Sequence, residues 1–159
     1  MTVYTHRDVN VLAIETSCDE TACSIVRNGR EVLSNAIFTQ MHIHREYGGV
    51  VPEIASRNHL EKINDVVDKA ILDAGLHKED IDVIAVTSTP GLIGALVVGV
   101  ATAKTMAYAL SKPLVGVHHI AGHIAANYLD HRELEPPFIS LVISGGHTSV
   151  IDVKDYNEH

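Results

Sequence analysis

The chain has 159 residues, with 12 Lys and Arg against 20 Asp and Glu, which gives a formal net charge of −8 with neutral histidines. Hydrophobic residues make up 46% and charged residues 20% of the chain, which excludes a disordered protein and allows one domain plus part of another. The acidic balance argues against a protein that coats nucleic acid by bulk charge. It leaves open an RNA substrate presented with a more basic partner.

Cysteine content and hydropathy bear on the compartment. Cys18 and Cys23 are the only two cysteines, which excludes a disulfide scaffold and fits a reducing environment. We expect both to be small buried hydrophobic residues. Met1 to Asp8 is too polar for a signal peptide, and the longest apolar run, residues 92–103, is shorter than a membrane span. We therefore expect a cytoplasmic protein that contacts no membrane.

The first forty residues predict an antiparallel meander of three strands, over residues 10–16, 22–27 and 31–38. The first of these holds the continuous apolar run that is typical of a strand in the middle of a sheet. Asn28 and Gly29 separate the second from the third and favour a two-residue hairpin turn, which needs positive φ at both positions.

A loop over residues 39–51 is expected to lead into a helix. Pro52 suits the first helical turn, and Gly75 is a natural stop at the other end. Between them, six apolar residues recur at helical spacing and mark one buried face. They are Ile63, Val66, Val67, Ala70, Ile71 and Ala74.

Strands and helices then alternate: strand 81–87, a glycine-bearing turn at 90–94, an apolar helix to Leu110, strand 114–117 and helix 119–129. Gly94 and Gly99 would let the apolar helix approach a neighbour closely.

Residues 133–137 form the clearest boundary in the chain. A new hairpin follows, with strands 138–144 and 149–153, and it repeats the strand–turn–strand pattern of the opening. The element order, three strands and a helix followed by alternating strands and helices, indicates a duplicated α/β fold of the actin-like ATPase (RNase H-like) type. We expect a complete first lobe over residues 1–135 and the first hairpin of a second lobe over residues 136–159.

Two turns carry candidate ligand groups: one joins the first two strands of the chain, and the other joins the two strands of the last hairpin. Residues 17–21 offer Ser17 and Thr21 hydroxyls beside Asp19 and Glu20, which suits a phosphate, a metal or an oriented nucleophile. Residues 144–148 place two glycines where backbone can approach a ligand closely. Taken alone, each turn is better explained as an ordinary hydrated hairpin. The presence of both in one chain suggests a nucleotide clamp.

His119 and His123 share one helical face at i, i+4, a common metal-ligand spacing. With eleven histidines in the chain, about one such pair is expected by chance. The position of this pair is more informative, because it opens a helix directly after a buried strand. A zinc protease of the HExxH kind would need Glu after the first histidine, where this chain has Ile120. His118, one residue earlier, points elsewhere on the helix and is expected to be structural.

Five motifs in one order, at residues 14–21, 48–53, 90–94, 118–123 and 144–148, closely resemble the tRNA N6-adenosine threonylcarbamoyltransferase family. The resemblance covers residues 9–153. It implies a two-lobed actin-like ATPase fold and transfer of a threonylcarbamoyl group from threonylcarbamoyl-AMP to N6 of adenosine 37, in tRNAs that read codons beginning with A.

By the same resemblance, His119 and His123 match two metal ligands, with iron the expected divalent metal and zinc the alternative. Asp19 and Glu20 match acids near the reacting group. The substrate-binding stretch corresponds to Val142, Ile143, Ser144, Gly145 and Gly146. The implied partners are tRNA, a related non-catalytic paralogue, a small ATPase and the enzyme that makes the adenylate.

The family is roughly twice as long as this chain, so a third metal ligand, an Asp, and most of the second lobe are expected beyond His159. We therefore expect the chain alone to be inactive or nearly so. Exposed apolar residues of the last hairpin, Phe138, Leu141 and Ile143, predict self-association. The alternatives are a non-catalytic module that binds the paralogue and, less favoured, a metalloprotease.

Overall fold

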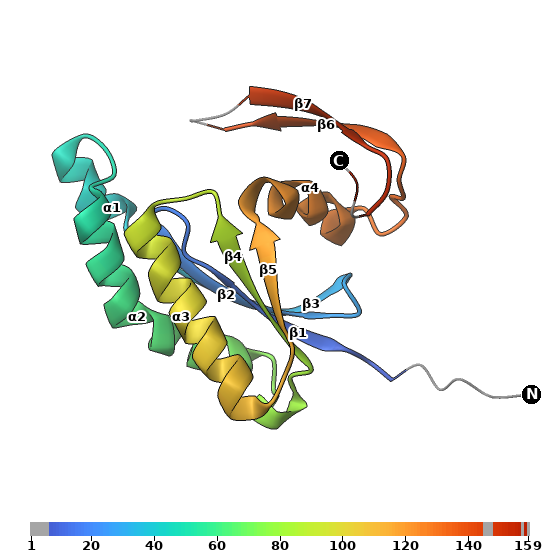
Figure 1. Cartoon of the computed structure of the whole chain (residues 1–159), viewed down its shortest axis with the longest axis horizontal. Helices are drawn as coiled ribbons and strands as arrows, with labels where there is room; N and C mark the ends of the chain where they lie inside the picture. Colours follow the sequence, from blue (N-terminus) through green and yellow to red (C-terminus); the bar gives the residue numbers. More distant parts are fainter. Residues whose placement is uncertain (1–6, 145–147, 157, 159) are drawn as a thin grey trace, which may run out of the picture.

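The computed structural model describes residues 7–144, 148–156 and 158. Its main layer is a five-stranded mixed sheet with the order β3-β2-β1-β4-β5 (Figure 1). The first three strands pair antiparallel, as the meander predicts, and the last two run parallel to β1. The strands are β1 (Asn10–Glu15), β2 (Glu20–Arg27), β3 (Glu31–Thr39), β4 (Val83–Thr89) and β5 (Leu114–His118).

Two long helices, α2 (Pro52–Asp73) and α3 (Ile93–Leu110), pack on one face of this sheet, and α4 (His119–Asp130) lies on the opposite side (Figure 1). Side chains alternate between the two faces of a strand. In β1 and β4, one set of alternating residues joins the core under α2 and α3; this set is Leu12, Ile14, Ile84 and Val86. The residues between them, among which are Ala13 and Ala85, line a hollow that Gly122 of α4 closes.

Local sequence signals explain where these elements turn and end. Asn28 and Gly29 both adopt positive φ, 52° and 71°, and form the predicted hairpin turn. Pro52 occupies the first turn of α2, and Gly75, at φ 66°, follows its end. The residues predicted for the buried face of α2 pack in the main core, with Ala74 partly buried at its edge.

The segment predicted as a loop before α2 contains two short helices. They are α1 (Met41–His44) and the 3₁₀ helix η1 (Arg45–Tyr47), and the left-handed Gly48 ends the second. Neither is long enough to show an apolar period, which is why the sequence pattern missed them. A further 3₁₀ turn, η2 (Lys78–Asp80), leads into β4.

A second, two-stranded sheet comprises β6 (Phe138–Ile143) and β7 (Thr148–Val153). It packs on α4 through a small separate core of Ile124, Val142 and Val153. Leu141 and Ile143 are exposed, as expected, together with Ile139. Phe138 is instead partly buried, because its ring packs edge-to-face on the ring of Tyr128, with the ring centroids 5.9 Å apart.

Helix α3 is, by length and composition, apolar enough to cross a membrane, with a mean hydropathy of 1.6 over 18 residues. The apolar run at residues 92–103 is shorter than a span, and the helix reaches this length because it continues through Lys104 to Leu110. One face of α3 nevertheless packs inward: Gly99 approaches Thr16, directly after β1, and Gly94 approaches Ser56 of α2. This is the close approach predicted for the two glycines, and it belongs to helix packing.

Candidate functional site

The site lies where the parallel strands end. Because β1, β4 and β5 are parallel, their carboxyl ends meet at one edge of the sheet, which is where α/β proteins commonly bind ligands. Glu15 ends β1, and His119 begins α4 directly after β5. His119 Nδ1 lies 3.2 Å from Glu15 Oε2, so residues 104 positions apart meet at this edge.

The two histidines of α4 face each other, as their spacing predicts. Their Nε2 atoms are 3.0 Å apart, and the rings meet edge-to-face with centroids 4.5 Å apart. His119 is half-buried and His123 exposed, so the pair is open to solvent on one side. In the described part of the chain, no group of three or more His, Cys, Asp or Glu side chains is arranged to hold a metal.

Glu15 is the most heavily hydrogen-bonded carboxylate of the site. It accepts from the backbone N–H and hydroxyl of Ser17, from the Thr87 hydroxyl and from His119. Burial alone would raise the pKa of Glu15, but these hydrogen bonds outweigh it and lower the pKa below its ordinary value. The carboxylate is therefore ionised at neutral pH.

The first turn is held in place from two sides. The Ser17 carbonyl accepts a hydrogen bond from the Leu92 N–H at 2.8 Å, and a Cβ added to Gly91 would lie 2.6 Å from that carbonyl oxygen. From the other side, buried His59 of α2 bonds to the Cys18 carbonyl at 3.0 Å and to the Thr21 hydroxyl at 2.7 Å. The backbone of residues 17–21 is thus fixed rather than free.

Asp19 and Glu20, the predicted acids of this turn, are half-buried and exposed respectively. Among the described residues, the hydrogen bonds and ion pairs of the histidine side chains go to Glu15, Ser17 and each other, so neither acid contacts them. The role expected for Asp19 and Glu20 therefore stays a prediction.

The predicted substrate-binding stretch begins beside the histidines. His123 and Asn127 of α4 face β6 across a hollow of about 240 Å³, which Val142, Ile143 and Ser144 also line. The Val142 side chain is buried in the small core, so it would offer a ligand its backbone. Gly145 and Gly146 lie outside the described residues.

The two cysteines differ from each other. Cys23 is buried as expected, and burial raises the pKa of its thiol to about 12. Cys18 is exposed, which contradicts the expectation, because it lies in the turn rather than in a strand. Desolvation and the neighbouring acids Asp19 and Glu20 raise the pKa of Cys18 to about 11, so neither thiol is an activated nucleophile. His118 is structural, as expected: its ring accepts the Ile120 N–H and caps α4.

Sequence reasoning overlooked Glu15 and His59 as site residues. Both had a visible signal. Glu15 is a charged residue at the end of a buried apolar strand, and His59 is a polar residue on the apolar face of a helix, four positions before Ile63.

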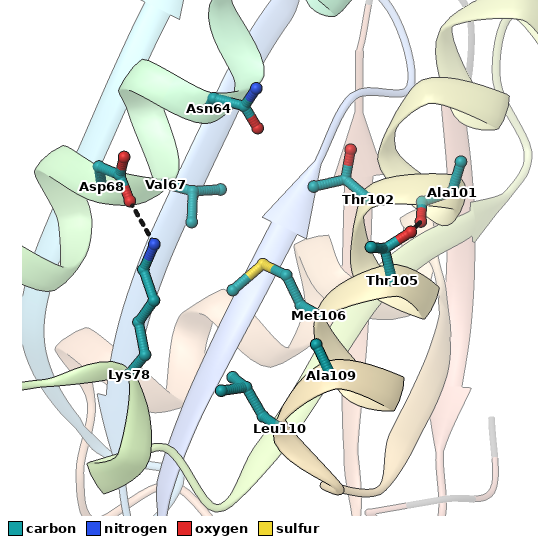
Figure 2. Close-up of a pocket in the computed structure, with 10 residues that line it drawn as sticks. All are labelled: Asn64, Val67, Asp68, Lys78, Ala101, Thr102, Thr105, Met106, Ala109 and Leu110. Atoms are coloured by element: carbon teal, nitrogen blue, oxygen red, sulfur yellow. Dashed lines mark hydrogen bonds and ion pairs between the residues drawn. The ribbon is translucent and has the colours of Figure 1, made fainter.

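A separate groove lies between α2 and α3, on the face of the sheet away from α4 (Figure 2). Its lining is mainly apolar, with Met106 and Leu110 on one wall and Val67 on the other. An ion pair between Lys78 and Asp68, at 2.9 Å, closes one end. The groove contains none of the predicted site residues.

Comparison with known proteins gives concordant results. The family model of tRNA N6-adenosine threonylcarbamoyltransferase matches residues 31–159. The enzyme of that name from Clostridium perfringens (strain 13 / Type A) is 62% identical over 148 residues, which are 93% of this chain and 44% of the relative. The one from Clostridioides difficile (strain 630) is 58% identical over 152 residues, 96% of this chain and 45% of the relative. The chain therefore spans a little under half the length of these relatives.

A solved structure of YeaZ from Pseudomonas aeruginosa shares the fold, with a TM-score of 0.58 at 16% identity over 90% of this chain and 64% of that one. The mixed α/β fold with its five-stranded sheet agrees with the expected fold class at this level. On the family match and the identity of the curated relatives, the chain belongs to the tRNA N6-adenosine threonylcarbamoyltransferase family.

Proposed function

We propose that this chain forms the N-terminal part of an enzyme that transfers a threonylcarbamoyl group from threonylcarbamoyl-AMP to N6 of adenosine 37 in tRNAs reading codons that begin with A. The supporting observation is the facing Nε2 atoms of His119 and His123, 3.0 Å apart, beside the hollow that β6 lines. In this proposal residues 1–135 are the first lobe of an actin-like ATPase fold, and residues 136–159 begin the second lobe.

The histidine pair fits a divalent cation in part. Imidazole nitrogens suit both iron and zinc, at distances of about 2.1 Å, so two nitrogens 3.0 Å apart can reach one ion. The remaining ligand, an Asp in this proposal, would come from residues beyond His159. When bound, the cation would polarise or anchor the threonylcarbamoyl group.

In this proposal the residues of this chain orient the metal-ligating histidine and bind the adenylate. Glu15 would hold the His119 ring. The fixed turn at residues 17–21 would place Asp19 and Glu20 near the reacting group. The stretch from Val142 to Gly146 would bind the adenylate chiefly through backbone and, together with the first turn, would form a clamp. Attack of the adenosine N6 amine on the carbamoyl carbon would break its bond to the phosphate oxygen, release AMP and require a base for the amine proton.

The proposed partners are tRNA, a non-catalytic paralogue, a small ATPase and the enzyme that makes the adenylate, all in the cytoplasm. The YeaZ-like fold supports pairing with a paralogue of similar shape. The exposed apolar residues Ile93, Val97 and Tyr108 on α3 provide a surface for it. The net charge of −8 favours binding of the tRNA backbone by other parts of the assembly.

A chimera tests the function. Residues of the Clostridium perfringens relative that align with this chain are replaced by it, which leaves the rest of that enzyme as a second lobe. With partners, threonylcarbamoyl-AMP and tRNA, we expect modified adenosine by mass spectrometry of the nucleosides. His119→Ala in the chimera should abolish it, and His131→Ala, an exposed histidine beyond α4, should not. A folded chimera without product would overturn the proposal, and turnover by residues 1–159 alone would overturn the expected inactivity.

A binding module without catalysis is the second candidate, favoured by the exposed apolar face of α3. Capture of the paralogue with no dependence on metal or nucleotide, by a chimera that modifies no tRNA, would select it. The protease alternative has no structural support at the position of the base, because Ile120 packs against the core of α4 and β6.

A further inference from the structure

The orientation of His119 is set by a residue outside the proposed ligand set. Its Nδ1 atom lies 3.2 Å from Glu15 Oε2 and 3.2 Å from Ser17 Oγ. A carboxylate accepts hydrogen bonds and donates none, and Glu15 already receives the Ser17 N–H and the Ser17 and Thr87 hydroxyls. The hydrogen bond between Glu15 Oε2 and His119 Nδ1 therefore requires a proton on Nδ1.

Protonation at Nδ1 leaves the lone pair of neutral His119 on Nε2. This is the atom that faces His123 Nε2, at 3.0 Å, so His123 donates its Nε2–H to it. Free histidine side chains prefer the other tautomer only slightly, so one charged hydrogen bond is sufficient to reverse the preference. The carboxylate also fixes the ring plane, because Ser17 and Thr87 hold the carboxylate itself.

We propose that Glu15 is a positioning residue: it holds His119 as the Nδ1–H tautomer and so keeps the Nε2 lone pair of His119 available, beside His123, for a divalent cation. The inference deepens the proposed function and rests on it for the use of the cation. Carboxylates that accept from the outer nitrogen of a ligating histidine commonly change metal affinity 10- to 100-fold.

The first measurement needs neither metal nor tRNA. The chain is labelled with ¹⁵N, and long-range proton–nitrogen spectra are recorded at about pH 8, above the ordinary histidine pKa of about 6.5. We expect His119 to show a protonated Nδ1 and an unprotonated Nε2. Glu15→Ala should shift the ring toward the Nε2–H tautomer, whereas Glu15→Gln, whose amide oxygen still accepts, should retain the native form.

The second measurement is a Co²⁺ titration followed by the visible absorption of the bound ion. Glu15→Ala should weaken Co²⁺ binding about 10- to 100-fold and Glu15→Gln by less. Glu31→Ala, which removes an exposed carboxylate at the start of β3, should leave both the tautomer and the Co²⁺ affinity unchanged. An Nε2–H tautomer in the unmodified chain would overturn the proposal even if the alanine variant fails to fold. Co²⁺ affinity within twofold of the parent in folded Glu15→Ala would also overturn it.

The two proposals fail separately. Loss of tRNA modification in the chimera with the expected tautomer in place would reject the transferase role and leave the part played by Glu15 intact. A chimera that modifies tRNA equally well with and without Glu15, and with the Nε2–H tautomer, would reject only the positioning role.

Discussion

Replacing His59 tests whether a buried histidine holds the first turn of the site. His59 is fully buried on α2. Its Nε2 lies 3.0 Å from the Cys18 carbonyl, which only accepts, so Nε2 carries the proton and donates. Nδ1 then accepts from the Thr21 hydroxyl at 2.7 Å. His59→Leu removes both partners while it keeps most of the side-chain volume.

The expected cost follows from the two groups left behind. Thr21 is fully buried, and an unsatisfied buried hydroxyl costs about 1–3 kcal/mol. The Cys18 carbonyl belongs to an exposed residue, where water can replace the lost donor, so it adds about 1 kcal/mol. We expect His59→Leu to lower the free energy of unfolding by about 2–4 kcal/mol, measured by urea denaturation with linear extrapolation.

Two controls make this result specific. His42→Leu, at an exposed position on α1, should change stability by no more than about 0.5 kcal/mol. Adding Thr21→Val to His59→Leu removes the orphaned hydroxyl, so the double variant should be less destabilised than the sum of the single variants by about 1 kcal/mol or more. Strict additivity, or a cost of His59→Leu below about 1 kcal/mol, would refute the reasoning.

The pH dependence of the same variant has a definite sign. Burial lowers the pKa of His59 below 6.5, more than the Cys18 carbonyl and the nearby Glu15 and Asp19 carboxylates raise it. The unfolded chain therefore binds more protons than the folded chain just below pH 6.5, and stability rises with pH there. The advantage of the parent over His59→Leu should shrink as the pH falls below about 6.5 in urea titrations. An advantage that grows on acidification would contradict the direction of the shift.

Two further substitutions test the packing around the site. Gly91→Ala should distort the first turn and lower the free energy of unfolding by about 1–3 kcal/mol, because the added Cβ would lie 2.6 Å from the Ser17 carbonyl oxygen. The control Gly49→Ala adds a Cβ in open space and should change stability by no more than about 0.5 kcal/mol. Equal denaturation midpoints for the two variants would contradict this. Ile84→Ala, in the core strand β4, should lower the free energy of unfolding by about 2–5 kcal/mol. Leu72→Ala, at an exposed position on α2, should leave it almost unchanged. Equal losses of stability in the two variants would show that Ile84 is not in the core.

Self-association remains open to a direct test. Ile139, Leu141 and Ile143 form an exposed apolar row on β6. We expect the sedimentation coefficient of the chain to rise with concentration, and Leu141→Lys to reduce that rise. A monodisperse monomer over the whole concentration range would contradict the expectation.

Most of the local structure could be predicted from short stretches of sequence. Continuous apolar runs, the Asn28–Gly29 turn and the apolar spacing in α2 are short-range signals, and each produced the predicted element. The segment before α2 was missed because one helical turn has no period to detect. Phe138 and Cys18 were misjudged because burial depends on what packs against a residue: Tyr128 packs against Phe138, whereas Cys18 lies in an exposed turn.

Which side chains of the site lie together depends on the packing of distant segments. The spacing of His119 and His123 can be seen in the sequence, but the hydrogen-bond partner of His119 is Glu15, 104 residues away. They meet because β1, β4 and β5 lie parallel in the order that the sheet adopts, so that the end of β1 and the start of α4 share one edge. Strand order is a property of long-range packing, and no local pattern of residues specifies it.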